Sequence, residues 1–227
     1  MKRGKKYREK KQKIENKSYS INEALSILYQ FLEEEKIESV DIAVNLNVDP
    51  RHADQQLRGA INLPNGGFQT KRILVFSDEV DKDSYIKMGA TYVGMNEYLE
   101  KFKSGWADFD VMITHPKNMK DIAKFGRLLG PKGLMPNPKL GTVSQDLEKA
   151  LISIVKGRAE YRTDKGGILH VQIGKTSMPE EQVKENYDFF LTMIHKMKPA
   201  SVKGNFIKGI YLSTTQSPSI KLINEYN

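Results

Sequence analysis

The sequence predicts an α/β (α+β) protein with two domains, one of which is interrupted in the chain by the other. From Ile73 to Val155, short apolar runs alternate with helical patterns, as in a Rossmann-like α/β domain with parallel strands. Half-buried strand patterns and one long helix pattern occupy the flanking sequence. Two breaks with turn-forming residues, at 64–67 and 157–160, separate these two kinds of sequence pattern. The predicted domains are therefore a discontinuous split α/β domain of residues 1–66 and 159–227 and an inserted domain of residues 67–158.

The first segment of the split domain contains a helix pattern followed by a strand pattern. Ser20 and Glu23 have the spacing of a capping box. The apolar residues after them repeat at helical spacing, which predicts a helix ending near Lys36. Apolar and polar residues then alternate over 40–48, which predicts a half-buried strand with one free polar face. A second strand is expected over 57–63.

The inserted domain shows strand and helix patterns in alternation. The expected strands are 73–76, 91–93 and 109–113, and the expected helices are 82–88, 96–103, 118–125 and 144–155. The first strand, Ile73-Leu74-Val75-Phe76, is apolar throughout, which is typical of a parallel strand covered on both faces.

The second segment of the split domain begins with a hairpin pattern and contains the longest helix pattern. Strands over 161–163 and 168–173 are expected to flank the turn Asp164-Lys165-Gly166-Gly167. Apolar residues at helical spacing predict a helix over 180–197. A closing strand is expected just before the hydroxyl-bearing run Ser213-Thr214-Thr215.

Residues 130–143 contain three Pro and three Gly. Pro fixes φ and Gly permits backbone shapes closed to other residues, so this stretch is neither a helix nor a central strand. We expect a stiff, defined loop that carries Lys132 and Lys139. Such a loop is either a rigid connection or a functional element, and composition does not separate the two.

Composition excludes several classes of protein. The 227 residues are 39% hydrophobic, which is enough for packed cores. There is no Cys, so disulfides, Cys-ligated zinc and thiol catalysis are excluded. No apolar run approaches the roughly 20 residues that span a bilayer, so we expect a soluble protein with no membrane partner.

The net charge of +8 is concentrated at the N-terminus. Residues 1–17 hold nine Lys or Arg and two Glu, whereas the rest of the chain is nearly balanced. This segment has no apolar core and therefore does not resemble a secretory signal. A basic arm of this kind is either a nucleic-acid contact or a solvated, disordered end.

No catalytic or metal-binding constellation is evident, and we expect no cofactor and no metal. Gly174-Lys175-Thr176 matches the end of a phosphate-binding loop, but Leu169 occupies the place of its first glycine. Four His residues lack metal-ligand spacing: His52, His115, His170 and His195. The competing class is an α/β enzyme that binds a nucleotide in the inserted domain. No nucleophile–base–acid set supports it.

Motifs spread along the chain are shared with one known family. They include Lys2-Arg3-Gly4-Lys5-Lys6-Tyr7, residues 39–46, Asp49-Pro50-Arg51, residues 130–143, Tyr161-Arg162-Thr163-Asp164-Lys165, Lys198-Pro199-Ala200 and Ser213-Thr214-Thr215. On these motifs the chain resembles, nearly end to end, the bacterial-type L1 family of large-subunit ribosomal proteins. The match at the N-terminus implies that residue 1 is a natural start and not part of a targeting segment.

The resemblance implies a non-enzymatic, two-domain protein that is a monomer within the large ribosomal subunit, in the cytoplasm. It implies binding to the stalk helices of large-subunit ribosomal RNA, chiefly through the split domain, and contact with deacylated tRNA at the exit site. It also implies repression of the protein's own operon through a stalk-like structure in messenger RNA. A free translational repressor without a ribosomal role is an open alternative, because one RNA surface serves both.

Carried over by position, the resemblance implies an RNA surface. Its predicted ribosomal RNA contacts are Lys36, Glu38, Ser39, Arg162, Asp164, Lys165, His170, Ser213, Thr214 and Thr215. We expect accessory basic contacts from Lys2, Arg3, Lys5, Lys6, Arg8, Lys132 and Lys139. The two breaks predict a hinge at Pro64, Gly66, Gly67 and Gly157. Ser and Thr hydroxyls suit the 2′-hydroxyl of RNA, and Lys and Arg neutralise phosphates.

Three positions depart from the family's usual sequence. Glu35-Lys36 stands where the family has Lys-Phe, Gln216-Ser217 where it has Met-Gly, and Asn65 where it has His. The loss of a Phe and a Met removes apolar packing against RNA. We therefore expect either a lower affinity than is typical of the family or a changed RNA partner.

Overall fold

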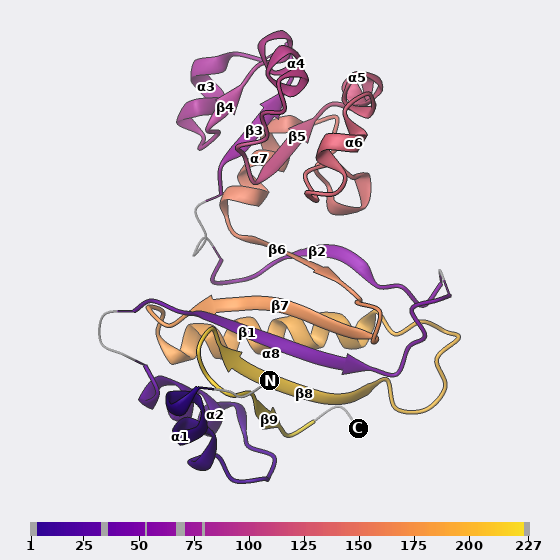
Figure 1. Ribbon diagram of the computed structural model, residues 1–227. Coiled ribbons are helices and arrows are strands. Elements are labelled where there is room, and N and C mark those ends of the chain that lie inside the picture. The colour runs from indigo at the N-terminus through magenta and orange to yellow at the C-terminus, as the bar shows by residue number, and fades with distance from the viewer. Residues whose placement is uncertain (1–3, 33–35, 53, 67–70, 79, 225–227) are drawn as a thin grey trace. The chain divides into compact units, whose positions relative to one another are not determined.

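The computed structural model describes residues 4–32, 36–52, 54–66, 71–78 and 80–224 (Figure 1). The chain divides into two compact units, which we call the split unit (Met1–Phe68 with Ala159–Asn227) and the inserted unit (Gln69–Arg158). Helices and sheets combine as the sequence predicts, which confirms the α/β class. The assignment of RNA binding to the split unit stays a prediction.

A four-stranded antiparallel sheet forms the body of the split unit. Its strand order is β7 (Ile168–Lys175), β1 (Ser39–Leu46), β8 (Ile207–Thr214) and β9 (Ile220–Leu222). The strand β1 comes from the first chain segment and pairs on both sides with strands of the second. Burial alternates along β1, since its even-numbered residues from Val40 to Leu46 are buried and its odd-numbered ones are partly exposed. The sheet therefore has one covered face and one open face.

Two helices cover one face of this sheet. From α2 (Ile21–Gln30), Leu25 and Leu28 join the same core as the buried residues of β1, and Phe190 joins it from α8 (Glu180–Lys196). Figure 1 shows α8 lying along the sheet, behind β1 and β7. Burying one such apolar side chain contributes roughly 1.5–3 kcal/mol. This shared core therefore holds the two chain segments together.

Three smaller elements complete the split unit. The strands β2 (Arg58–Asn62) and β6 (Arg158–Arg162) form a separate two-stranded sheet, and α1 (Lys5–Gln12) precedes α2. Tyr19 joins the N-terminal segment to the sheet edge, because its N–H donates to the carbonyl of Lys221 at 2.9 Å. Tyr19 also forms a parallel bridge with Leu222.

The inserted unit has helices on both faces of a short parallel sheet. Its strand order is β4 (Tyr92–Val93), β3 (Ile73–Phe76) and β5 (Val111–Thr114). Ile73 and Val75 lie in one core with α3 (Lys82–Lys87) and α7 (Leu147–Val155). Leu74 and Phe76 lie in a second core with α4 (Asn96–Lys103) and α5 (Met119–Ala123). All of β3 is buried, as its apolar run predicts.

Residues 130–143, which we call the Gly/Pro-rich loop, have a defined shape, as predicted. The loop follows the 3-10 turn η1 (Pro116–Asn118) and the helix α6 (Gly126–Leu129), and it contains a second 3-10 turn, η2 (Pro138–Leu140). Gly133 and Gly141 take φ of 73° and 61°, a region that favours glycine. Within the loop, the N–H of Asn137 donates to Thr142 Oγ1 at 2.8 Å, and Thr142 Oγ1 donates to the Asn137 carbonyl at 3.2 Å.

Besides the 3-10 turns, four elements differ from the sequence prediction: α2, α1, β9 and α6, a helix that follows directly after the expected helix 118–125. The helix α2 begins at its capping box, but it ends at Gln30 rather than near Lys36. Three consecutive glutamates occupy 33–35, and negative charge is unfavourable at a helix C-terminus. Neither α1 nor β9 was predicted, because eight mostly charged residues and a three-residue strand give little periodic signal.

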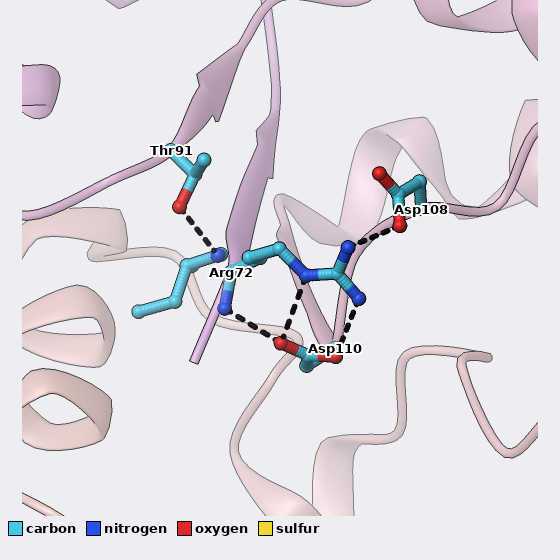
Figure 2. Close-up of polar contacts among 5 residues, drawn as sticks. Arg72, Thr91, Asp108 and Asp110 are labelled. Atoms are coloured by element: carbon cyan, nitrogen blue, oxygen red, sulfur yellow. Dashed lines mark hydrogen bonds and ion pairs between the residues drawn. The ribbon is translucent and has the colours of Figure 1, made fainter. Parts of the chain in front are cut away.

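An arginine–aspartate cluster joins the starts of β3 and β5 (Figure 2). The Arg72 guanidinium contacts Asp108, and it donates to Asp110 from Nη2 at 3.1 Å and from Nε at 3.3 Å. The backbones of Arg72 and Asp110 are also joined, because Asp110 N–H donates to the Arg72 carbonyl at 2.8 Å. Beside them, the N–H of Ile73 donates to Thr91 Oγ1 at 3.2 Å. The side-chain hydrogen bonds from Arg72 lower the pKa of Asp110.

We predict that Asp110→Asn lowers the Tm of the inserted unit by a few degrees at neutral pH, because the charge that pairs with Arg72 is lost. The emission of Trp106, the only Trp of the chain, reports this transition. Because the folded-state pKa of Asp110 lies below its ordinary value, the stabilisation is present at neutral pH and disappears as the pH falls through that pKa. The Tm values of wild type and variant should converge below about pH 4. A difference that persists undiminished in acid would contradict this assignment.

Candidate nucleic-acid interface

The open face of the four-stranded sheet carries a continuous, mostly polar surface. Seven residues that are at least partly exposed lie on it in two neighbouring rows: Gln172, Asp41 and Ser213, then His170, Ala43, Tyr211 and Lys221. Partial burial raises the pKa of Asp41. Because α2 and α8 cover the opposite face, a large partner can contact the side chains of the strands on this face.

The first group of predicted contacts meets at one end of this sheet. We call it the strand-end cluster, and its members are Glu38, Ser39, Ser213, Thr214 and Thr215. Ser39 and Thr215 are 176 positions apart in the chain, yet the N–H of Ser39 donates to Thr215 Oγ1 at 3.2 Å. The antiparallel pairing of β1 with β8 brings them together, because the start of one strand lies beside the end of the other.

Glu38 is the buried carboxylate of the strand-end cluster, with only 7% of its surface exposed. Its Oε2 accepts from the N–H of Gln216 at 3.1 Å. Its own N–H donates to Thr176 Oγ1 at 2.8 Å. A carboxylate engaged in this way positions the turn that follows β8, because buried polar groups need such partners. Sequence patterns did not predict this role, since the contact joins two distant segments.

Thr214 and Thr215 have different surroundings. Thr214 is the last residue of β8 and is buried, whereas Thr215 begins the following turn and is exposed. Ser217 closes that turn, because its Oγ accepts from the N–H of Thr214 at 2.8 Å. The hydroxyl offered at the surface is therefore that of Thr215, and Thr214 packs within the sheet.

The second group of predicted contacts lies at the turn that leads into β7. Asp164 Oδ1 accepts from the N–H groups of Gly166 and Ile168, each at 2.8 Å, and Oδ2 lies 3.5 Å from His170 Nε2. The hydrogen bond from Ile168 is the largest cause that lowers the pKa of Asp164. Asp164 therefore holds the turn, and Lys165 and His170 are exposed beside it.

The two remaining predicted contacts flank these groups. Arg162 is the exposed last residue of β6, and Lys36 is exposed three positions before β1. The described site residues thus fall into two groups, joined by the rows of the open sheet face. The structure does not gather them into one cluster.

The predicted accessory basic residues are distributed over both units. Lys5, Lys6 and Arg8 are exposed on α1, and Lys132 and Lys139 are exposed on the Gly/Pro-rich loop of the inserted unit. Lys2 and Arg3 lie outside the described residues.

A buried asparagine fixes the chain beside the first predicted hinge. Asn186 of α8 is fully buried, and its Oδ1 accepts from the N–H of Asn65 at 2.9 Å. Its Nδ2 donates to the carbonyls of Asn65 at 3.1 Å and of Ile173 at 2.8 Å. Asn65, which departs from the family's usual His, is therefore tied to the split unit. Sequence analysis did not predict this contact.

Gly157, at the second predicted hinge, also has a local structural role. It takes a φ of 94° directly after the C-cap of α7, and its N–H donates to the carbonyl of Ile154 at 3.1 Å. This is the conformation in which glycine ends a helix. Motion about Pro64, Gly66 and Gly157 stays a prediction, and Gly67 lies outside the described residues.

The glycine of the partial phosphate-loop motif has a packing role. A Cβ on Gly174 would lie 3.0 Å from a methyl group of Val183, so glycine allows α8 to approach β7. Among the described residues, His, Asp and Glu side chains form no group of three that could hold a metal ion. The described helices are all too short or too polar to span a bilayer.

Comparison with known proteins assigns the chain to a family. The model of the ribosomal protein L1p/L10e family matches residues 6–218. The chain is 43% identical over 222 residues to the large ribosomal subunit protein uL1 of Lactobacillus acidophilus, covering 97% of this chain and 96% of that protein.

Two further relatives carry the same name. The uL1 protein of Bacteroides fragilis is 45% identical over 211 residues, covering 92% of this chain and 91% of the relative. That of Bacteroides thetaiotaomicron is 44% identical over 212 residues, with 93% and 91% covered. The chain therefore belongs to the L1 family of ribosomal proteins, whose members are structural, non-enzymatic components of the ribosome.

We predict that Glu38→Ala destabilises the split unit by about 1–3 kcal/mol, because the N–H of Gln216 loses its buried acceptor. Glu38→Gln keeps an acceptor oxygen at the same place and serves as the matched control. Urea denaturation followed by circular dichroism measures both variants. Equal losses for Ala and Gln would show that the charge of Glu38, and not its hydrogen bond, stabilises the turn.

Proposed function

We propose that the chain is a structural constituent of the large ribosomal subunit and binds the stalk region of large-subunit ribosomal RNA through the open sheet face of the split unit. The observation that carries this proposal is that Ser213 of the strand-end cluster and His170 of the second group lie on the same open face of the sheet. The family's place on bacterial ribosomes supports a cytoplasmic location.

The chemistry of this face suits folded RNA. A-form RNA is recognised mainly by its shape, its 2′-hydroxyls and its phosphates. The hydroxyl of Thr215 both donates and accepts, so it matches a 2′-hydroxyl, and the N–H of Ser39 holds this hydroxyl in place. Lys165 and Arg162 supply positive charge for phosphates at the other group.

Two further RNA partners belong to this proposal. Deacylated tRNA leaving the exit site is the partner that a stalk protein would contact. The protein's own operon messenger RNA would be bound where it mimics the stalk, and binding there represses translation. The same open face serves ribosomal and messenger RNA, because both present the same folded shape to the same side chains.

The direct test is sedimentation of the tagged protein through a sucrose gradient of a cell lysate, combined with binding of the purified chain to a stalk-region ribosomal RNA fragment. We expect co-sedimentation with the large subunit and preference for the fragment over a random RNA of equal length. Recovery only from the ribosome-free fractions, together with fragment binding, would instead support a free repressor.

We predict that Thr215→Val weakens binding to the stalk fragment by about 1–3 kcal/mol, because RNA loses a hydroxyl partner and Ser39 N–H loses its acceptor. Thr215→Ser retains the hydroxyl and should bind within about 0.5 kcal/mol of wild type. Fluorescence anisotropy with labelled fragment measures both. Wild-type affinity for the Val variant would remove Thr215 from the interface.

The exposed cations of α1 should add affinity without specificity, since phosphate contacts carry no sequence information. Replacing Lys5, Lys6 and Arg8 with Gln should make the dependence of log K on log salt less steep by about 0.7 for each lost phosphate contact. The preference for stalk RNA over random RNA should be unchanged. An unaltered slope of log K against log salt would show that α1 does not contact the RNA.

A further inference from the structure

A groove lies where the N-terminal segment meets the β9 edge of the sheet. It has a volume of about 530 Å³, and we call it the edge groove. Its walls are Lys11 and residues 14–17 on one side and Tyr211, Ser219 and Lys221 on the other. This volume is within the range of about 300–1,000 Å³ that is usual for small-molecule sites.

Backbone hydrogen bonds hold in place the wall of the edge groove that residues 14–17 form. The N–H of Tyr19 donates to the carbonyl of Lys221 at 2.9 Å, and the N–H of Ile223 donates to the carbonyl of Tyr19 at 2.9 Å. The Tyr19 hydroxyl accepts from the N–H of Glu15 at 3.0 Å, and only 5% of Tyr19 is exposed. These hydrogen bonds hold the segment 14–17 beside Lys221 of β9, the residue that pairs with Tyr211. The groove is therefore formed before a ligand binds.

The edge groove is positively charged. Lys11, Lys17 and Lys221 line it together with one acid, Glu15. Glu15 lies 2.7 Å from Lys17 and neutralises it in part, so the four side chains carry a net charge of +2. Lys11 and Lys221 line different walls, so an anion in the groove has positive charge on both sides.

Tyr211 supplies an aromatic surface on the inner wall. It lies opposite Lys221 on β9 and Ala43 on β1, in the same row of the open face as His170. Gly209 has no side chain, and a Cβ there would lie 3.3 Å from the Tyr211 ring. The ring therefore extends along β8 over Gly209, on the partly exposed face of the strand.

We propose that the edge groove binds a nucleotide of single-stranded RNA, with its phosphate between Lys11 and Lys221 and its base against Tyr211. An unpaired base stacks on an aromatic ring, whereas a base inside a duplex is not available for this. Lysines beside an aromatic ring are the combination with which proteins bind single strands. The inference rests on the proposed function, because it extends the same RNA surface from Ser213 along β8 to the sheet edge.

The position of Tyr211 gives the groove a defined place in that surface. Tyr211 is two residues from Ser213 on the same face of β8, and Ser213 belongs to the strand-end cluster. A strand of RNA leaving the strand-end cluster thus meets Tyr211 next and then the three lysines. Unpaired nucleotides next to the stalk helices, and not the helices themselves, are the expected occupants.

The test uses the full chain and labelled oligouridylate of twelve nucleotides, with anisotropy as the readout. Tyr211→Leu should weaken binding by about five- to a hundred-fold, the effect of losing one base–aromatic stack. Tyr211→Phe keeps the ring and should bind as wild type. The double variant Lys11→Gln, Lys221→Gln should make the salt dependence less steep by about 0.7 for each phosphate released. The double variant Lys184→Gln, Lys196→Gln, an equal charge change on α8, should alter neither quantity.

Ultraviolet crosslinking to the same oligonucleotide, read by mass spectrometry, gives a second readout that needs no variant. Crosslinks to the peptide that contains Tyr211 support the proposal, and crosslinks confined to other peptides overturn it. Wild-type affinity for Tyr211→Leu would overturn it as well. Full competition by inorganic phosphate or by hexaglutamate would overturn it too, since charge alone would then explain binding.

The same variants, measured against the stalk fragment, separate this inference from the proposed function. If the fragment binds but Tyr211 has no effect on oligouridylate, only the edge groove fails. If oligouridylate binding depends on Tyr211 but the stalk fragment is not preferred over random RNA, only the proposed function fails.

Discussion

The pairing of β1 with both β7 and β8 is the constraint on which the split unit depends. It joins a strand near residue 40 to strands near 170 and 210. The inserted unit lies between these strands in the sequence. Each pairing closes a long loop, and the entropy of that closure must be regained by burial in the core shared with α2 and α8. The sheet is complete only when the last segment of the chain has paired, and non-local strand pairs of this kind favour slow folding.

The same pairing also builds the candidate site. Alternation along β1 sends Val40 and Ile42 into the core and leaves Asp41 and Ala43 on the open face. Antiparallel register then brings the start of β1 to the end of β8, where Ser39 meets Thr215. Residues that look like isolated polar positions in the sequence become one surface, because the sheet that stabilises the unit also arranges them.

Several predicted residues turn out to act through their neighbours. Glu38 holds the turn after β8, Asp164 holds the turn before β7, and Thr214 is buried in the sheet. Lys36, Arg162, Lys165, His170 and Thr215, by contrast, are exposed. Acidic residues among the proposed RNA contacts are understandable on this basis, since their carboxylates accept hydrogen bonds from backbone N–H groups.

Sequence patterns predicted the elements whose signal is local. The alternation in β1, the apolar run of β3 and the helical spacing in α8 appear within a few residues of the expected places. The end of α2 and the strand β9 could not be predicted this way, because β9 is three residues long and is defined by its pairing with β8. Family resemblance supplied the positions of the candidate contacts. It did not supply the bond between Ser39 and Thr215, the anchoring of Asn65 by Asn186, or the edge groove, since each joins segments far apart in the chain.

We propose that RNA lies on the open face of the four-stranded sheet. Ultraviolet crosslinking of the protein within assembled large subunits, followed by mass spectrometry of RNA-linked peptides, locates the RNA on the protein. We expect crosslinks in peptides that contain the open-face residues of β1, β7 and β8 and the turns at Thr215 and Lys165. Crosslinks restricted to α2, α8 or the inserted unit would contradict it.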